Sequence, residues 1–294
     1  MKWVTAVRNE KTFIGIVKEE KVFNLTALAK SSDVKFPSTL IEAISLGESV
    51  FEQVETLIHS DSAQNHTYGL NEVQLKSPIP RPWKNVFCIG KNYRDHAIEM
   101  GSEADIPEDI MVFSKAPTSV IGHGDGIPNH SSITNQLDYE GELAIIIGKT
   151  GTGIKKENAM DHVFGYTIIN DITARDLQKK HKQFLLGKSL NGTCPMGPWI
   201  VHHSDVPNPE NLSIVTKVNG EVRQNGNTSD FIFDIPTMIT ELSKGMTLEA
   251  GDIIATGTPA GVGKGMKPPV FLKAGDSIEI TIEGIGTLRN EIVE

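Results

Sequence analysis

Three acidic residues stand at alternate positions in the segment QLDYEGELAIIIGK, residues 136–149. Side chains alternate between the two faces of a strand, so Asp138, Glu140 and Glu142 are expected to share one face. The apolar run AIII follows them and is suited to burial. Carboxylates crowded beside a core repel one another and lose hydration, so a compensating positive charge is expected nearby.

A further acid, Asp171, directly follows the apolar strand pattern GYTIIN. Together with Glu140 and Glu142 it offers only oxygen donors, the ligands that suit Mg²⁺ or Mn²⁺. Such a set fills part of an octahedron and leaves positions for water or substrate. The sequence therefore indicates a site for a divalent cation. The simpler alternative is a solvated strand face.

The segment CIGKNYRDHAIEMG, residues 88–101, predicts a strand that leads into a short helix. His96 and Glu99 are three residues apart, a spacing that puts them on one helical face. A carboxylate beside an imidazole orients it and raises its basicity, so the pair is a candidate general base. A surface salt bridge is the alternative. The polar segment GSEADIPED that follows is suited to a mobile flap.

Lys188 stands between a glycine and a serine in FLLGKSLNGTCPMGPW, residues 184–199. The segment is otherwise tight and apolar, so the lysine is expected to be partly desolvated and able to neutralise a substrate carboxylate or enolate. The alternative is an exposed loop lysine.

The sequence predicts a strand-dominated α+β fold, which must position these residues. Short strand patterns in residues 1–28 predict a small antiparallel sheet, and residues 37–58 have helical spacing. A proline-rich stretch near residues 75–82 suggests a boundary between a small N-terminal domain, 1–78, and a catalytic domain, 79–294. Beyond it, strand patterns outnumber the helical candidates, which are residues 93–100, 156–161, 174–182 and 235–243.

The composition of the chain argues against some classes of binding partner. The net charge of −9 over 294 residues argues against nucleic acid, which needs a basic face. No signal-peptide pattern and no apolar run of membrane-spanning length is present, so a cytoplasmic protein is expected. Cys88 and Cys194 lack metal or redox spacing and are expected to be reduced thiols.

Three glycine-rich segments fail to match better-known motifs. ATGTPAGVGKG, residues 255–265, lacks the first glycine and the final Ser or Thr of a Walker loop. GHGDG lacks the third glycine of a dinucleotide fingerprint, and GKSLNG is not a nucleophile elbow. ATP binding, hydride transfer and serine hydrolysis therefore lose support.

Taken in order, GKNYRDHAIEMG, DYEGELAIIIGK, GYTIINDITARD, GKSLNGTCPMGPW and GDIIATGTPAGVG resemble the fumarylacetoacetate hydrolase family over residues 80–294. The resemblance is strongest to bacterial members with a small N-terminal domain, among them the YisK-like oxaloacetate decarboxylases. It implies mixed β-sheets rolled into a barrel-like core, a homodimer, and a catalytic Mg²⁺ or Mn²⁺.

The resemblance also implies roles for individual residues. The metal ligands would be Glu140, Glu142 and Asp171, and Asp138 is not among them. The catalytic residues would be His96, Glu99 and Lys188. Substrate contacts would come from Lys91, Gln178 and Thr258.

Members of the family act on 2-oxo acids, so the resemblance implies metal-dependent cleavage of a C–C bond through an enolate. Decarboxylation of oxaloacetate to pyruvate is the favoured reaction. The alternatives are hydrolysis of an acylpyruvate, keto–enol tautomerisation of oxaloacetate, and an isomerase activity of the 2-hydroxyhepta-2,4-diene-1,7-dioate type. An alternative of another class is a non-catalytic binding or regulatory protein on the same scaffold.

Overall fold

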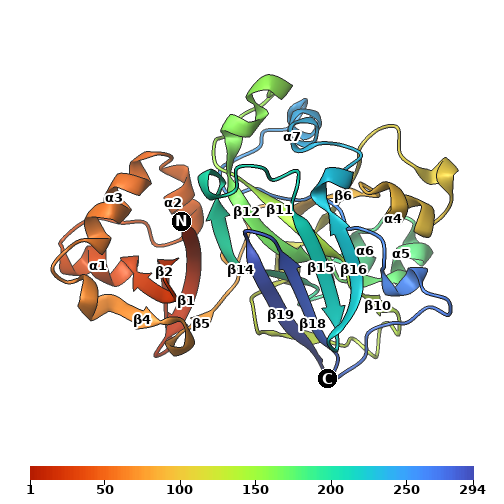
Figure 1. Cartoon of the computed structure of the whole chain (residues 1–294), viewed down its shortest axis with the longest axis horizontal. Coiled ribbons are helices and arrows are strands. Elements are labelled where there is room, and N and C mark those ends of the chain that lie inside the picture. The colour runs from red at the N-terminus through yellow and green to blue at the C-terminus, as the bar shows by residue number, and fades with distance from the viewer.

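The computed structural model describes residues 1–294. Figure 1 shows the N-terminal elements, in red and orange, beside the larger remainder of the molecule. These elements are β1 (Lys2–Arg8), β2 (Lys11–Lys18), β3 (Lys21–Asn24), α1 (Leu25–Ser31), α2 (Leu40–Ser45), α3 (Ser49–Ile58), β4 (Thr67–Gly69) and β5 (Gln74–Leu75).

A 12-stranded mixed sheet runs through both parts, in the order β4-β3-β2-β1-β14-β12-β11-β17-β6-β7 with β5 and β8 paired beside it. The N-terminal strands join it where β1 pairs antiparallel with β14. The remaining strands are β6 (Val86–Gly90), β7 (Met111–Lys115), β8 (Val120–Ile121), β11 (Gly141–Ile147), β12 (Val163–Asn170), β14 (Cys194–His202) and β17 (Ile253–Ala255).

Two smaller sheets complete the fold. The five-stranded sheet, β16-β15-β18-β19-β9, packs against the large one, and β10 pairs with β13 alone. Their strands are β9 (Gly126–Pro128), β10 (Leu137–Asp138), β13 (Thr173–Ala174), β15 (Ser213–Val218), β16 (Glu221–Asn227), β18 (Ser277–Ile282) and β19 (Gly286–Val293). The strand-dominated α+β class with mixed sheets is confirmed. The sheets do not close into a barrel, because both ends of each strand order are free edges.

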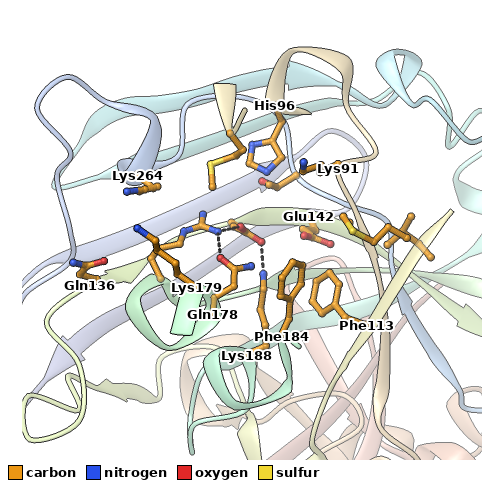
Figure 2. Close-up of a pocket in the computed structure, with 17 residues that line it drawn as sticks. Lys91, His96, Phe113, Gln136, Glu142, Gln178, Lys179, Phe184, Lys188 and Lys264 are labelled. Carbon is orange, nitrogen blue, oxygen red and sulfur yellow. Dashed lines mark hydrogen bonds and ion pairs between the residues drawn. The ribbon is translucent and has the colours of Figure 1, made fainter. Parts of the chain in front are cut away.

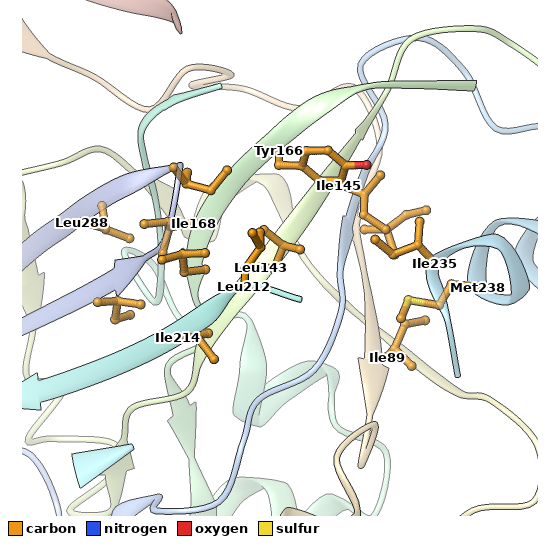
Figure 3. Close-up of a cluster of buried hydrophobic side chains, with 14 of the residues drawn as sticks. Ile89, Leu143, Ile145, Tyr166, Ile168, Leu212, Ile214, Ile235, Met238 and Leu288 are labelled. Atoms are coloured by element: carbon orange, nitrogen blue, oxygen red, sulfur yellow. The ribbon is translucent and has the colours of Figure 1, made fainter. Parts of the chain in front are cut away.

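Strand β11 is buried on both faces and separates two hydrophobic cores. Leu143, Ile145 and Ile147 face a cluster that also contains residues of β12, the five-stranded sheet and α7 (Ile235–Ser243), as Figure 3 shows. Ala144 and Ile146 face a second cluster, shared with the N-terminal helices. This period of two places Glu142 on the second face, at the strand's beginning.

Most predicted helices are present. α2 and α3 fill the predicted region 37–58 but are separated at Gly47, whose φ of +58° suits glycine at a helix end. α4 (Arg94–Glu99), α5 (Arg175–His181) and α7 lie where predicted. The region 156–161 is a 3₁₀ helix, Lys156–His162, instead of an α-helix.

Two short helices were not predicted. The N-terminal strand pattern ends earlier than expected, because the Asn24 side chain accepts a hydrogen bond from the Ala27 amide and begins α1. α6 (Leu185–Lys188) carries Lys188 at its last position, where a loop was expected.

Both cysteines are buried free thiols, as predicted. No helix is long and apolar enough to cross a membrane. The division at residue 78 and the homodimer stay predictions.

Replacing Ile145 with alanine should lower the free energy of unfolding by about 2–5 kcal/mol, because the side chain is fully buried between two sheets and its loss leaves a cavity. Urea denaturation followed by tryptophan fluorescence measures the change. Val222→Ala is the control, since Val222 is 52% exposed. Equal effects of the two substitutions would contradict this description of the core.

Candidate metal centre and active site

The antiparallel pairing of β11 with β12 brings the acidic residues together. Gly141 lies opposite Asn170 and Glu142 opposite Ile169, so the beginning of one strand meets the end of the other. The Asp171 amide then donates a hydrogen bond to the Glu140 carbonyl oxygen at 2.8 Å. One oxygen from each of Glu140, Glu142 and Asp171 lies within 4.8 Å of the others, and all three residues are buried.

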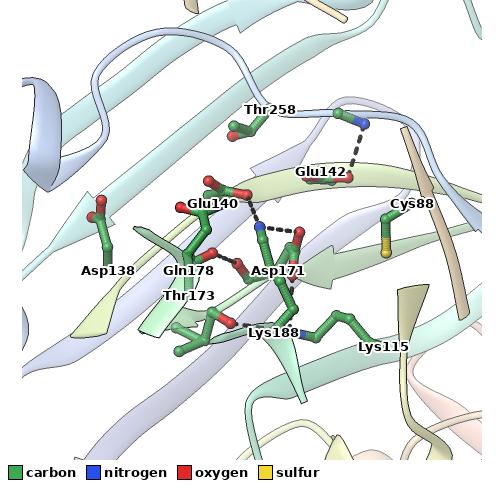
Figure 4. A network of polar contacts seen from close by, with 12 residues as sticks. Cys88, Lys115, Asp138, Glu140, Glu142, Asp171, Thr173, Gln178, Lys188 and Thr258 are labelled. Atoms are coloured by element: carbon green, nitrogen blue, oxygen red, sulfur yellow. Dashed lines mark hydrogen bonds and ion pairs between the residues drawn. The ribbon is translucent and has the colours of Figure 1, made fainter. Parts of the chain in front are cut away.

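Two lysines compensate part of this negative charge, as Figure 4 shows. Lys188 Nζ lies 2.6 Å from Glu140 Oε2 and 2.5 Å from Asp171 Oδ2. Lys115, at the end of β7, reaches Asp171 Oδ1 from the other side at 2.8 Å. Both lysines are almost completely buried. Lys188 is therefore a buried partner of the acids, and the exposed-loop alternative is excluded.

Asp138 belongs to a separate part of the network. It lies in β10, and the chain leaves regular strand geometry at Tyr139 before β11 begins. Its carboxylate accepts hydrogen bonds from Arg175 Nε at 2.8 Å and from two backbone amides, of Gly263 at 2.7 Å and Lys264 at 3.0 Å. The simple alternation expected for residues 138–142 therefore does not hold, because strand geometry is interrupted at Tyr139 and the Asp138 carboxylate binds Arg175 Nε and the amides of residues 263 and 264.

Arg175, the first residue of α5, links the two groups. Its Nη1 lies 2.7 Å from Glu140 Oε1 and 3.3 Å from Gln178 Oε1. Its Nη2 is buried and has no hydrogen-bond partner. A buried guanidinium NH₂ without an acceptor is costly, so this group is available to an anionic ligand.

The positive charges in this cluster are fewer than its negative charges. Asp138, Glu140, Glu142 and Asp171 face Lys115, Lys188 and Arg175, and Glu142 pairs with none of the three. Its only hydrogen bond in this network comes from the Gly257 amide, at 2.8 Å. The cluster therefore carries one uncompensated negative charge when every group is ionised.

The pKa values follow this imbalance. Burial, Asp171 and Glu140 raise the pKa of Glu142 well above its ordinary value. Burial would also raise the pKa of Glu140, but Lys188 and Arg175 outweigh it and hold that pKa below its usual range. Burial alone would lower the pKa of Lys188, and the attraction of Asp171 and Glu140 raises it instead.

This donor set fits a hard divalent cation. Three buried carboxylates supply oxygen ligands at close range, and Glu142 has excess negative charge that such an ion would offset. Mg²⁺ or Mn²⁺ would therefore be held by Glu140, Glu142 and Asp171.

A cavity of about 320 Å³ opens onto this cluster, a volume at the small end for ligand sites. Its apolar side contains Phe113 and Phe184, and the lining also includes the apolar residues Ile89, Met100 and Met111. The opposite end is polar and cationic, with Gln136, Lys179 and Lys264. Figure 2 shows these two ends on either side of the carboxylates.

His96 lines the cavity opposite Lys188 (Figure 2), and Glu99 lies behind it. His96 Nδ1 lies 3.2 Å from Glu99 Oε2, and Glu99 Oε1 accepts a hydrogen bond from the Gly261 amide at 3.0 Å. The imidazole is 6% exposed, so it is not part of a surface salt bridge. Its orientation by Glu99 leaves Nε2 free of protein partners.

The three predicted substrate contacts all line the cavity. Lys91 has a φ of +53° and reaches Asp105 Oδ1 at 3.4 Å, so its ammonium group is partly engaged. The Gln178 amide nitrogen has no protein acceptor. Thr258 Oγ1 donates to the Gly141 carbonyl and accepts from Gln224 Nε2, which commits its hydroxyl proton to the fold.

Sequence reasoning missed Lys115, Arg175, Lys179 and Lys264. Lys115 ends a short strand pattern, MVFSK, in the same way that Asp171 follows another, and that position is a usable signal. Arg175 stands four residues after Asp171, but nothing in its spacing indicated that it pairs with residues of another strand.

Comparison with known proteins agrees with this geometry. The family described as fumarylacetoacetate (FAA) hydrolase C-terminal matches residues 85–293. The chain belongs to the fumarylacetoacetate hydrolase family.

A family member from Bacillus subtilis (strain 168), named oxaloacetate tautomerase YisK, is 57% identical over 300 residues, which cover 99% of this chain and 100% of that protein. The crystal structure of a fumarylacetoacetate hydrolase from psychrophilic Exiguobacterium antarcticum has a TM-score of 0.85 at 46% identity and covers 100% of this chain and 99% of its own. Maleylpyruvate hydrolase from Sphingobium sp. SYK-6, in complex with manganese(II) and pyruvate, has a TM-score of 0.79 at 31% identity, with coverage of 100% and 99%.

Glu142→Gln should raise the thermal midpoint of the protein in EDTA by a few degrees at about pH 8, with the difference closing toward about pH 4. The raised pKa means that the folded wild type holds this proton more tightly than the unfolded chain. Wild-type stability therefore falls as the pH rises from the ordinary carboxyl pKa toward the raised one, and glutamine escapes this loss.

Differential scanning calorimetry across this pH range measures the effect, with Glu157→Gln, an exposed site, as the matched control. A lower midpoint for Glu142→Gln at about pH 8 would contradict the uncompensated charge. Mn²⁺ should stabilise the wild type and the control but not Glu142→Gln, because one ligand is lost.

Proposed function

We propose that this protein catalyses the keto–enol tautomerisation of oxaloacetate with a Mg²⁺ or Mn²⁺ ion held by Glu140, Glu142 and Asp171. The observation that carries the proposal is the buried carboxylate cluster at the base of a cavity that His96, held by Glu99, lines from the opposite side. The name of the Bacillus subtilis relative, oxaloacetate tautomerase, supports this reaction over the others.

Tautomerisation moves one proton and needs no other reactant. The C3–H bond breaks, its electrons form the C2–C3 double bond, and the carbonyl oxygen gains a proton. His96 is placed to accept the C3 proton through Nε2, because Glu99 holds Nδ1 and orients the ring toward the cavity. Burial of His96 limits access of competing water.

Negative charge that develops on the substrate oxygen faces Lys188, Gln178 and the free Nη2 of Arg175. Lys188 and Arg175 are buried and already held by Glu140 and Asp171, so they need little reorganisation during the reaction. A bound Mg²⁺ or Mn²⁺ would supply Lewis-acid polarisation of the 2-oxo group.

Decarboxylation of oxaloacetate, the reaction favoured from the sequence, is the second candidate. It forms the enolate of pyruvate, whose negative charge also develops on the 2-oxo oxygen, so the same donors would serve it. The apolar side of the cavity, with Phe113 and Phe184, favours it by desolvating a departing carboxylate. Hydrolysis of an acylpyruvate and isomerisation of a longer dioate would use the same donors on a longer substrate.

Purified protein with Mn²⁺ should accelerate the approach of keto-oxaloacetate to its enol equilibrium, measured by the ultraviolet absorbance of the enol. EDTA should remove the acceleration. Pyruvate release at a comparable rate, measured with lactate dehydrogenase, would make decarboxylation the main reaction. No turnover of oxaloacetate, acylpyruvates or longer 2-oxo dioates with Mn²⁺ would favour a non-catalytic binding protein.

Replacing His96 with glutamine should reduce the rate roughly 10²–10⁴-fold, because glutamine keeps the hydrogen bonding but cannot carry the proton. Affinity for Mn²⁺, measured by isothermal titration calorimetry, should stay within about threefold, since His96 lies outside the ligand set. His59→Gln, at an exposed site, is the control. Loss of Mn²⁺ binding in His96→Gln would assign the imidazole to the metal instead.

A further inference from the structure

The glycine-rich segment 255–265, which does not match a phosphate-binding loop, lies beside the proposed active site. The Gly261 amide binds Glu99, and the amides of Gly263 and Lys264 bind Asp138. A Cβ atom on Gly263 would meet the Val270 carbonyl oxygen, and one on Gly265 would meet the Glu99 carboxylate. The glycines therefore let this loop, Gly261–Gly265, pass between the catalytic pair and the Asp138–Arg175 pair.

The loop carries a lysine to the cavity. Lys264 is exposed and lines the cavity, and Lys179 of α5 lines it from the facing side, as Figure 2 shows. Unlike the other cavity cations Lys91, Arg175 and Lys188, these two lysines form no ion pair within the protein. They are the uncommitted positive charges of the cavity, at the end opposite its apolar side.

We propose that Lys179 and Lys264 form a subsite for the second carboxylate of a 2-oxo diacid and so determine substrate specificity. The inference rests on the proposed function, because it assumes that the 2-oxo carboxylate end of the substrate lies at the Glu140–Glu142–Asp171 cluster. A short diacid bound there extends either toward the apolar side or toward the two lysines. The two lysines are the cavity cations that no carboxylate of the protein already pairs, so they would offset the charge of a second carboxylate.

The subsite also selects between two reactions of one substrate. In oxaloacetate decarboxylation the C3–C4 bond breaks, its electrons pass toward the carbonyl oxygen, and the distal carboxylate leaves as neutral carbon dioxide. Cations that grip this carboxylate stabilise the ground state more than that transition state. Proton removal from C3 leaves the carboxylate charge in place. The two lysines therefore oppose decarboxylation and permit tautomerisation.

The substitutions Lys179→Met and Lys264→Met test the subsite by comparing two ligands that share the 2-oxo acid end. Oxaloacetate carries the second carboxylate, and pyruvate has only the 2-oxo acid end. In the Mg²⁺-loaded enzyme, each substitution should raise the KM for oxaloacetate about tenfold, while the inhibition constant of pyruvate stays within about twofold. Pyruvate formed per enolisation event should rise in both variants, most in the double variant.

Lys180→Met is the matched control, because Lys180 is the next residue of α5, is exposed, and does not line the cavity. It should leave both constants unchanged. Equal weakening of oxaloacetate and pyruvate binding by the variants would indicate general attraction of anions and overturn the subsite. An unchanged KM for oxaloacetate would overturn it as well, and an unchanged ratio of pyruvate to enol would overturn the selection between reactions.

Failure of the proposed function gives a different result. If the wild type does not turn over oxaloacetate, isothermal titration of the Mg²⁺-loaded protein with fresh oxaloacetate and with pyruvate still measures the subsite. Stronger wild-type binding of oxaloacetate that is lost in the two variants supports the subsite without the reaction. Equal binding of both ligands by wild type and variants overturns it.

Discussion

A shortage of one positive charge in a buried cluster governs the candidate active site of this protein. Asp138, Glu140, Glu142 and Asp171 face Lys115, Lys188 and Arg175 inside the fold, and Glu142 is left without a cation. Buried like charges are tolerated only when hydrogen bonds and opposite charges surround them. A divalent cation that offsets this charge, and the anion of a substrate that follows it, would complete the balance.

Regular structure holds the cluster together against its own repulsion. Glu140 and Asp171 are joined through their backbones by a hydrogen bond directly beyond the paired ends of β11 and β12. Two hydrophobic cores pack against the faces of β11, so neither strand can move away from the other without exposing apolar side chains. Burial of the acids lowers the stability of the fold, and the burial of apolar side chains in the two cores offsets this loss.

The cavity is divided into an apolar side and a cationic end, and this difference would set the orientation of a bound substrate. Asp138 contributes to this division without belonging to the metal ligands, because it holds Arg175 with one oxygen and, through backbone amides, the loop of Lys264. Glu99 holds the same loop at Gly261 while it orients His96. The proposed proton-transfer pair and the proposed carboxylate subsite therefore share one glycine loop, which would tie the geometry of proton removal to the geometry of substrate recognition.

Local patterns in the sequence were sufficient for the strand-dominated class, most helices, and the candidate residues Glu140, Glu142, Asp171, His96, Glu99 and Lys188. Lys188 stands in a tight apolar segment, and each of the others stands at the end of a strand pattern or at helical spacing from its partner, so these relations span few residues. Arg175, Lys115 and the pairing of Asp138 depended on tertiary structure, because their partners lie in other strands and loops. Alternation along one strand could not separate Asp138 from Glu140, since that separation follows from hydrogen bonds to a loop 125 residues further along the chain. The sequence determined which charges the protein would have to bury, and only the fold decided which of them would remain unpaired.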